Sequence, residues 1–273
     1  MLGPQSRRRI NRLASLFIDY PFAPLKNQVG INSRNQRIAP MVIQTWEENN
    51  FGKRHLASMQ KFRNRNSDLS FTILDALDRD SFMDSNWGRH PINEIYHRAK
   101  FGPLKADIFR YCFVHTNGGY YFDISKGMDC AITRLHDSTA SELITFEGTM
   151  HDFDLSASLQ ERLLRPRHLF VQWAFGFARE HPILSDLIES IVKRFPHYEK
   201  NVFQNPKSAI LKLTGPEAFT LAVHDYMSAN PDTSVNQLDF DFEGHGIYAL
   251  RGAGARHRKY PSYELVKDSS LFI

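Results

Sequence analysis

The stretch Lys105–Ser125, KADIFRYCFVHTNGGYYFDIS, decides the fold. Its first half predicts an amphipathic helix, and Asp107 and Arg110 share one helix face because they lie three positions apart. Asn117–Gly119 ends the helix, since glycine adopts the left-handed conformation that a helix end needs. A strand follows, and Asp123 falls where the chain leaves the sheet. Ligands of open α/β sheets bind at the carboxyl ends of strands, so this stretch delivers two acids and a guanidinium to a predicted site edge.

Strand-like and helix-like segments alternate along the rest of the chain, which indicates a mostly parallel α/β sheet. The predicted strands are 41–46, 70–74, 120–124, 142–146, 170–177, 238–242 and 246–250. The predicted helices are 54–66, 94–100, 103–115, 182–195 and 216–227. The tail after Leu250 is irregular and basic at its start, as in a loop that passes over something. No repeat or long linker divides the chain, so we expect a single domain at 38–273 after an N-terminal basic helix or arm at 1–37.

Composition favours a packed globule. Of the 273 residues, 42% are hydrophobic and 12% aromatic, far more than a disordered chain carries. The two cysteines, Cys112 and Cys130, are too few and too apolar in context for a disulfide framework or a zinc site, and they favour a reduced, cytoplasmic compartment. No apolar run approaches the roughly 20 residues of a membrane span.

The net charge of +4 comes partly from arginines at 7–9 and at 12. A secretory signal needs an apolar stretch of about 7–15 residues, and Asp19 and Pro21 interrupt the stretch that follows these arginines. We expect a solvated N-terminal helix or arm. An amphipathic helix on an anionic membrane is the open alternative, which would make the protein peripheral on the inner face of a membrane. Basic residues are scattered without a reader motif, so we expect no nucleic-acid partner.

A carboxylate at a strand end beside other acids suits a divalent cation that bridges a diphosphate. Manganese and magnesium prefer oxygen ligands, and such a metal neutralises charge on a leaving nucleoside diphosphate. Asp107 would hold sugar hydroxyls, and Arg110 would pair with phosphate or sugar oxygens. The structural alternative stays open, with Asp107 and Arg110 as a surface ion pair and Asp123 as a turn residue.

Taken together, these residues resemble glycosyltransferase family 32, whose core reads Ala/Ser-Asp-x-x-Arg-Tyr, a short spacer, then Gly-Gly-x-Tyr-x-Asp-x-Asp. This chain has ADIFRY at 106–111 and GGYYFDIS at 118–125. Flanking segments are similar too: IAPMVIQTW at 38–46, FGFAR followed by His-Pro at 175–182, and Thr-Gly-Pro at 214–216. The resemblance covers residues 38 to 225, most of the chain.

The resemblance implies a GT-A fold, a Rossmann-like and mostly parallel sheet flanked by helices, with a C-terminal acceptor-side region of helices and loops. The donor-binding core is then 38–150 and the acceptor-side region 151–273. The implied activity is transfer of a hexose from a nucleotide sugar to a glycan or lipid-linked acceptor, with retention, in polysaccharide or glycoconjugate biosynthesis. The implied cofactor is Mn2+ or Mg2+.

The resemblance also assigns roles to residues. Asp107, Arg110 and Asp123 are the implied catalytic residues, and Trp46 lies where an aromatic ring stacks on the nucleotide base, a contact of about 1–3 kcal/mol. As the alternative, Trp46 is plain core at a strand end. The full set of implied donor contacts is Trp46, Asp107, Arg110, Gly119, Tyr120 and Asp123.

One position departs from the family. The second acid of Asp-x-Asp is Ser125 here, and its hydroxyl is a much weaker metal ligand than a carboxylate. Asp129 would substitute if its loop folds back, or the Lys126 ammonium would supply the positive charge without a metal. A C-terminal loop often adds a further contact in this family. The candidates for it are His245, Arg256, His257 and Arg258, and the metal-ligand candidates as a whole are Asp123, Ser125 and His257.

Two other functions remain open. Ser125 also suits a degenerate, non-catalytic relative that binds a nucleotide sugar or a glycan. A strand that ends in aspartate is also typical of phosphatases of the haloacid dehalogenase type. Those need a second aspartate two residues on and a threonine soon after, where this chain has Ser125 and Gly127. They would also leave Asp107 and Arg110 unexplained.

Overall fold

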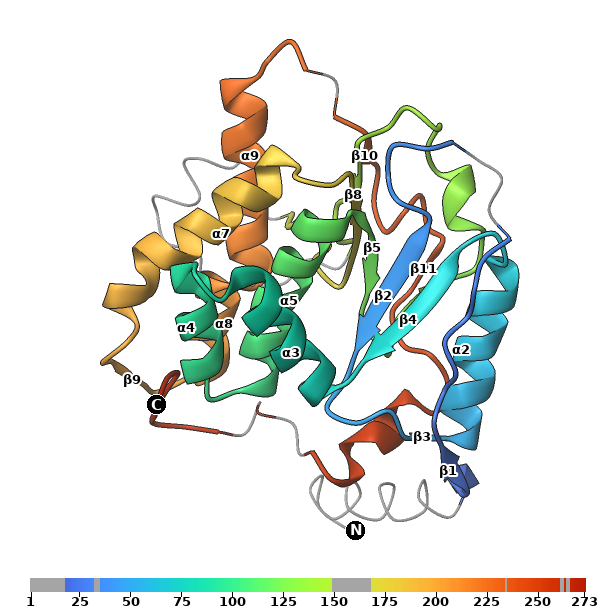
Figure 1. Cartoon of the computed structure of the whole chain (residues 1–273), viewed down its shortest axis with the longest axis horizontal. Helices are drawn as coiled ribbons and strands as arrows, with labels where there is room; N and C mark the ends of the chain where they lie inside the picture. Colours follow the sequence, from blue (N-terminus) through green and yellow to red (C-terminus); the bar gives the residue numbers. More distant parts are fainter. Residues whose placement is uncertain (1–17, 32–34, 149–167, 234, 261–262, 264–265) are drawn as a thin grey trace.

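A twisted central sheet with helices on both faces forms the body of the protein (Figure 1). The structure, a computed structural model, describes residues 18–31, 35–148, 168–233, 235–260, 263 and 266–273. In these residues the main sheet has the strand order β10-β7-β8-β5-β2-β4. Its strands are β2 (Met41–Thr45), β4 (Ser70–Leu74), β5 (Gly119–Phe122), β7 (Glu142–Thr145), β8 (Ala174–Phe177) and β10 (Gln237–Leu238).

The prediction of a mostly parallel sheet is confirmed. β2 pairs in parallel with both β4 and β5, and β10 pairs in parallel with β7. β8 is the exception, because it runs antiparallel to both of its neighbours, β5 and β7. The apolar character of β2 fits its central place, since a parallel strand is covered by helices on both faces.

Most helices cover one face of the sheet, and α2 (Lys53–Arg65) covers the other (Figure 1). Four of the predicted helices have a proline in the first turn, where its missing N–H costs no hydrogen bond. The helices on the first face are α3 (Ala76–Trp87), α4 (Pro91–Arg98), α5 (Gly102–Asn117), α7 (Pro182–Arg194), α8 (Pro206–Leu213) and α9 (Pro216–Ala229).

Two of these helices, α3 and α8, were not predicted from the sequence. α3 begins at a capping box in which the Asp75 carboxylate accepts from the N–H groups of Leu77 and Asp78. Its apolar face is sparse, however, and its buried residues are Arg79 and Met83. The helix therefore lacks the apolar periodicity on which the sequence argument depended.

The strand alternation of β5 divides the core into two sides. Tyr120 and Phe122 face α2 and pack with Phe62 and Phe71. Tyr121 faces the other way, into the larger cluster under α5 and α9. Because successive side chains of a strand point to opposite faces, Asp123 emerges on the α5 side with Tyr121.

The C-terminal part forms two small two-stranded sheets with earlier parts of the chain. β11 (Gly246–Ile247) pairs antiparallel with β6 (Gly127–Met128), away from the main sheet, and β12 (Ser269–Ser270) pairs with β9 (Val202–Phe203). Between them lies the short helix η3 (Ala253–Arg258), where the sequence predicted only a loop passing over something. The remaining short elements are β1 (Phe22–Ala23), β3 (Phe51–Gly52), η1 (Ile132–Arg134) and η2 (Phe195–His197).

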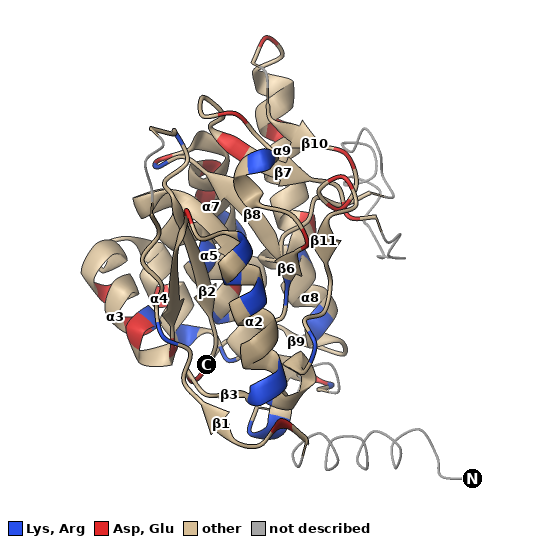
Figure 2. Cartoon of the chain, turned by 90° about the vertical axis from the view of Figure 1, so that its right-hand side faces the viewer, with Lys and Arg blue, Asp and Glu red and all other residues tan. Residues whose placement is uncertain are grey.

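Charged residues are spread over the surface in small groups. Figure 2 shows Lys and Arg positions along α2 and Asp and Glu positions on α3. None of the described helices is long and apolar enough to cross a membrane. The arginines at 7–9 and 12 lie outside the described residues, so the N-terminal helix or arm and its membrane contact stay predictions.

Candidate functional site

A cleft of about 750 Å³ opens at the carboxyl ends of β2 and β5. Its walls come from the segment after β2, the first turns of α5, and η3 with the residues that follow it. It therefore draws on both sides of the predicted boundary at residue 150. The lining residues that matter below are Trp46, Glu47, Asp107, Arg110, Tyr121, Asp123, Ser125, Gln172, Arg256 and His257.

Asp107 lies on the inward face of α5, where it is buried at the floor of the cleft. Its Oδ1 accepts from Gln172 Nε2 at 2.9 Å and lies 3.1 Å from Arg110 Nη2. Its Oδ2 accepts from the Thr214 hydroxyl at 2.9 Å. Both oxygens are thus held by partners from three parts of the chain, which fixes the carboxylate in one orientation.

Arg110 joins the two acids. Its Nη2 lies 3.1 Å from Asp107 Oδ1 and 3.2 Å from Asp123 Oδ1, and its side chain is only 5% exposed. Nη1 donates to the Gln172 carbonyl at 3.0 Å, and the guanidinium stacks on the Tyr121 ring at 4.3 Å. The surface ion pair that the sequence left open is therefore not what the structure shows, because this pair is buried.

Burial and these neighbours shift the ionisation of the group. Burial raises the pKa of Asp107 to about 6, and the Arg110 charge with the hydrogen bonds from Gln172 and Thr214 opposes that rise. Burial lowers the pKa of Arg110, but nearby Tyr121, Asp123 and Asp107 outweigh it, so the pKa ends above its ordinary value. The guanidinium stays charged, and Asp107 titrates close to neutral pH.

Asp123 follows β5 directly and faces the cleft with its side chain 32% exposed. Its Oδ1 accepts from the Tyr121 hydroxyl at 2.7 Å as well as from Arg110. Its backbone N–H donates to the Trp173 carbonyl at 2.8 Å. Asp123 is the more accessible of the two acids, as a group that contacts a ligand has to be.

Gly119 and Tyr120, which the resemblance implied as donor contacts, do not line this cleft. Gly119 is at the other end of β5 with φ +106°, and a Cβ there would come within 2.8 Å of the Met41 carbonyl oxygen. Tyr120 faces α2, and its hydroxyl lies 2.6 Å from His136 Nε2. Strand alternation places Tyr121 in the cleft instead, a residue that the same alternation could have identified from the sequence.

Trp46 lies in the cleft wall and packs against η3. The guanidinium of Arg256 lies 5.3 Å from the Trp46 ring, and His257 meets the ring edge-on at 5.5 Å. The Trp46 side chain is partly exposed in the cleft and also packs against the small core cluster that contains Phe51 and Met59, so both of its predicted roles stay open.

Arg256 brings a positive charge to the same wall. Its Nη1 donates to the Ala253 carbonyl at 2.7 Å, while its buried Nε has no hydrogen-bond partner among the described residues. Burial lowers the pKa of Arg256, and the charge of Asp123 raises it. An incompletely satisfied cation near Asp123 is suited to receive an anionic ligand.

Ser125 and His257 also line the cleft, as predicted for metal ligands, but the donor set does not fit the two-acid metal site of the family. Asp123 is partly engaged by Tyr121 and Arg110, and both oxygens of Asp107 are taken. In the part of the chain that the structure describes, no group of three His, Cys, Asp or Glu ligands gathers at this cleft.

The remaining candidates from the sequence lie elsewhere. Asp129 does not fold back to Asp123, because it pairs with His245 Nδ1 at 2.7 Å on the β6–β11 ribbon. Arg258 pairs with Glu48 at 2.9 Å, also outside the cleft. Lys126 lies over the Trp173 and Tyr248 rings, and burial lowers its pKa while Asp123 raises it. Arg256 and His257 are therefore the C-terminal candidates that reach the site.

Three residues of the floor were not assigned to the donor site from the sequence. Gln172 and Thr214 position Asp107, and Arg79 binds the Glu47 carboxylate at 3.1 Å. Gln172 lay in a segment predicted at most to line the acceptor side. Thr214 belongs to the Thr-Gly-Pro match. No pattern within the sequence places Gln172 or Thr214 beside Asp107.

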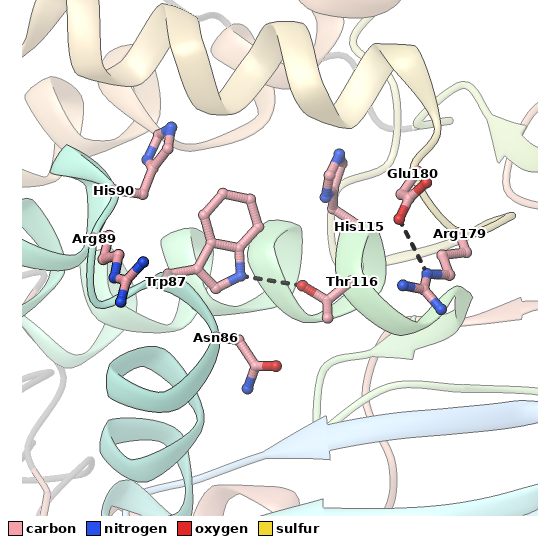
Figure 3. Close-up of a pocket in the computed structure, with 8 residues that line it drawn as sticks. All are labelled: Asn86, Trp87, Arg89, His90, His115, Thr116, Arg179 and Glu180. Carbon is pink, nitrogen blue, oxygen red and sulfur yellow. Dashed lines mark hydrogen bonds and ion pairs between the residues drawn. The ribbon is translucent and has the colours of Figure 1, made fainter.

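A second, smaller hollow of about 380 Å³ lies at the other end of α5 (Figure 3). There Trp87 Nε1 donates to the Thr116 hydroxyl at 3.1 Å, and Arg179 pairs with Glu180 at 3.2 Å. Its single acid is already paired, and it lies at the far end of α5 from Asp107. The hollow does not share the chemistry of the cleft.

Comparisons with known proteins identify the family to which the chain is similar. A family model described as "Glycosyltransferase sugar-binding region containing DXD motif" matches residues 5–142. Two curated relatives are named initiation-specific alpha-1,6-mannosyltransferase. The protein of Candida albicans (strain SC5314 / ATCC MYA-2876) is 28% identical over 206 residues, which cover 68% of this chain and 52% of that protein. The protein of Schizosaccharomyces pombe (strain 972 / ATCC 24843) is 29% identical over 200 residues, which cover 69% and 49%.

The chain therefore spans about half the length of the curated relatives that it matches. Among solved structures, the PaToxG Glycosyltransferase aligns with a TM-score of 0.50 at 15% identity, over 83% of this chain and 82% of that one. At this identity the likeness concerns the fold alone.

Proposed function

Because the chain belongs to the family of glycosyltransferases whose sugar-binding region contains a DXD motif, we propose that it transfers a hexose from a nucleotide sugar to a glycan or lipid-linked acceptor. The predicted fold, a GT-A-type mostly parallel sheet between helices, is confirmed. The observation that carries the proposal is the buried chain of ion pairs from Asp107 through Arg110 to Asp123 at the cleft floor.

This chain of ion pairs is built to hold a sugar in one orientation. Carboxylates accept hydrogen bonds from hydroxyl groups, and Asp123 is open enough to receive them. Arg110 is fixed by both acids, by a backbone carbonyl and by the Tyr121 ring, so it does not reorganise when a ligand arrives. Orienting the reacting sugar removes part of the entropic barrier to transfer.

The cleft wall formed by Trp46 and η3 suits the nucleotide. We place the base against Trp46 and the diphosphate between Asp123 and Arg256, where a cation stabilises the charge that develops on the leaving group. A divalent metal performs this task in much of the family, but the donor set here does not fit one. We therefore propose that Arg256, with Lys126 nearby, supplies the positive charge.

The names of the relatives narrow the choice of donor. Both are named as alpha-1,6-mannosyltransferases, so a mannose nucleotide is the first donor to test. In such a donor the sugar is α-linked to the diphosphate, and an α-linked product then means that the configuration is retained. We propose retention for this chain on that ground.

The test is release of nucleotide from a panel of UDP- and GDP-hexoses, including GDP-mannose, with and without a polysaccharide or glycolipid acceptor. Each reaction is run with EDTA and with added manganese. We expect turnover with at least one donor under both conditions and its loss in Asp123→Ala. Glu142→Gln is the matched control, because Glu142 is a buried acid paired with His181 outside the cleft. Absence of turnover across the panel would overturn the proposal.

Ser125 favours a second candidate, a non-catalytic relative that binds the nucleotide sugar. Calorimetry separates the two functions. Tight binding of a nucleotide sugar, without hydrolysis or transfer under any metal, would support the binding module and exclude the enzyme. Turnover that is lost in Asp123→Ala excludes the binding module.

A further inference from the structure

Three side chains with metal-binding groups meet at the end of the β6–β11 ribbon, outside the cleft. Asp129 and Cys130 follow β6, and His245 precedes β11. One ligand atom from each, a carboxylate oxygen, the Cys130 sulfur and an imidazole nitrogen, lies within 4.8 Å of the other two. The cleft residues that bind Arg110 take no part in this group.

The backbone holds these side chains together across a long stretch of sequence. Gly127 pairs with Ile247 and Met128 with Gly246, and the ladder continues with an Asp129 N–H that donates to the His245 carbonyl at 3.0 Å. The His245 ring then lies with Nδ1 2.7 Å from Asp129 Oδ1. The group is therefore assembled by the fold and does not depend on chance contact of surface side chains.

The turn before His245 is unusual. Asp241, Phe242, Glu243 and Gly244 all have positive φ, at 51°, 57°, 58° and 82°. Non-glycine residues in this region are strained, and such strain persists only where surrounding contacts impose it. Here Phe242 N–H donates to the Thr145 hydroxyl at 2.9 Å, and Gly246 N–H donates to the Asp241 carbonyl at 2.9 Å. The strained turn sets the position of His245 against Asp129.

We propose that Asp129, Cys130 and His245 bind a divalent transition metal of the zinc type. A thiolate, an imidazole and a carboxylate are the ligands that zinc takes, whereas magnesium and manganese prefer all-oxygen sites. Three protein ligands leave a fourth, open position for water. Tetrahedral zinc with bonds of about 2.0–2.3 Å separates its ligands by roughly 3.3–3.6 Å, so small side-chain rotations close the group around the ion.

The site is open to solvent, since the side chains of Asp129 and His245 are 58% and 45% exposed. A bound metal would link β6, which follows Asp123 and Ser125 of the cleft, to β11, which precedes η3. Because the ligands come together only in the folded chain, the metal would bind the folded state in preference to the unfolded one. The two cysteines alone gave no reason to expect zinc, because the third ligand is 116 positions from Asp129 in the sequence.

Cobalt substitution tests this proposal without any assay of transfer. Cobalt(II) is titrated into the metal-free full chain, and the near-ultraviolet charge-transfer band of a cobalt–thiolate bond is recorded. We expect one equivalent to bind at micromolar concentration, with a band that zinc abolishes by displacement. Cys130→Ser should lose the band, and Asp129→Asn and His245→Gln should weaken binding at least tenfold. Far-ultraviolet circular dichroism checks that each variant is folded.

Cys112→Ala is the matched control, because Cys112 is fully buried in α5 and should leave the band unchanged. Several results would overturn the proposal: no thiolate band, a band that survives in Cys130→Ser, or binding only at millimolar cobalt. Loss of binding in Asp123→Ala with full binding in His245→Gln would overturn it as well, by placing the metal at the cleft. Since none of these measurements needs a donor, failure here is distinct from failure of the proposed transferase activity.

Discussion

The cleft edge at Asp123 and the ribbon end at Asp129 lie close together in the sequence but carry opposite kinds of side chain. At the cleft, one accessible carboxylate is surrounded by Arg110, Arg256 and a serine in the place of an acid. At the ribbon, a carboxylate, a thiol and an imidazole converge within 4.8 Å of one another, and the nearby Arg65 donates to the Met128 carbonyl at 3.0 Å. The first region suits an anion, and the second suits a metal cation.

This difference separates two effects of a metal ion: stabilising the charge on the leaving diphosphate and stabilising the fold. Charge on a leaving diphosphate is stabilised either by a metal or by a guanidinium held in place. A metal at the ribbon would act on stability through the C-terminal segment and would not touch the donor. Dependence of this protein on metal in an assay therefore does not by itself identify the cleft as the metal site.

Arg110→Met gives the largest expected effect on the cleft. It leaves Asp107 and Asp123 without their shared cation, so we expect the free energy of unfolding to fall by about 3–5 kcal/mol. Donor turnover should fall by about 10³-fold, as when an oriented charge is removed from a site. Urea denaturation and initial rates measure the two effects. Arg63→Met, a buried arginine on α2, is the control that should retain turnover.

Arg256→Gln tests whether the cleft works through a guanidinium. We expect kcat to fall by about 10²-fold, with no recovery when manganese is added. Arg258→Gln in the same short helix is the control, because Arg258 pairs with Glu48 outside the cleft. If EDTA abolishes turnover and manganese restores it in the unmodified protein and equally in Cys130→Ser, the cleft is a metal site and the contrast with the ribbon fails.

The pKa of Asp107 predicts how the cleft responds to pH. If the ionised carboxylate is the form that helps hold the sugar, turnover should rise about tenfold per pH unit below about 6 and level off above it. Asp107→Asn should lack this rising limb. A pH–rate profile of donor hydrolysis measures it, and an identical limb in the variant would assign the titration to another group.

The same pKa has a consequence for stability. Since the pKa is raised from 3.8 to about 6 in the folded state, Asp107 contributes its full stabilisation below pH 4. That contribution is lost as pH rises through about 6. Between pH 4 and 6 the denaturation midpoint of the unmodified protein should therefore fall with pH relative to that of Asp107→Asn.

Zinc gives the smallest expected effect, confined to the ribbon. At a hundredfold excess over its Kd, an ion that binds only the folded state adds about 2.7 kcal/mol. For a chain of this size the melting temperature should rise by about 5–10 °C, and Cys130→Ser should show no rise. Turnover should be the same with and without zinc. A change in turnover that matches the change in melting temperature would couple the two regions.

The helix–turn–strand core could be predicted because its signals are local. The helix ends at Gly118 with φ +70°, as the glycine pair indicated, and Asp123 leaves the strand on the side facing the cleft. The predicted strand at 170–177 is continuous only over Ala174–Phe177, and Phe170 forms an isolated bridge with Phe146 before it. Apolar residues alone do not show where hydrogen-bonded pairing begins.

The rest of the site depends on contacts that no local pattern contains. Gln172 and Thr214 reach Asp107 from 65 and 107 positions away, and their residue types are common in loops and strands. Arg256 could be named only as one of four C-terminal candidates, because the path of η3 over the sheet decides which of them faces Trp46. The helix α8 is short, and its first signal, Asn205 before Pro206, is also typical of a turn.

The wall of the cleft that carries Arg256 and His257 is held at both ends and along η3 between them. At one end β11 pairs with β6. At the other end the Lys100 N–H donates to the Leu271 carbonyl at 2.9 Å, and Phe272 forms a bridge with Ala99. Between these ends, Arg258 pairs with Glu48 at 2.9 Å. A wall fixed along η3 as well as at its ends cannot swing open about one hinge, so a bound nucleotide should exchange slowly.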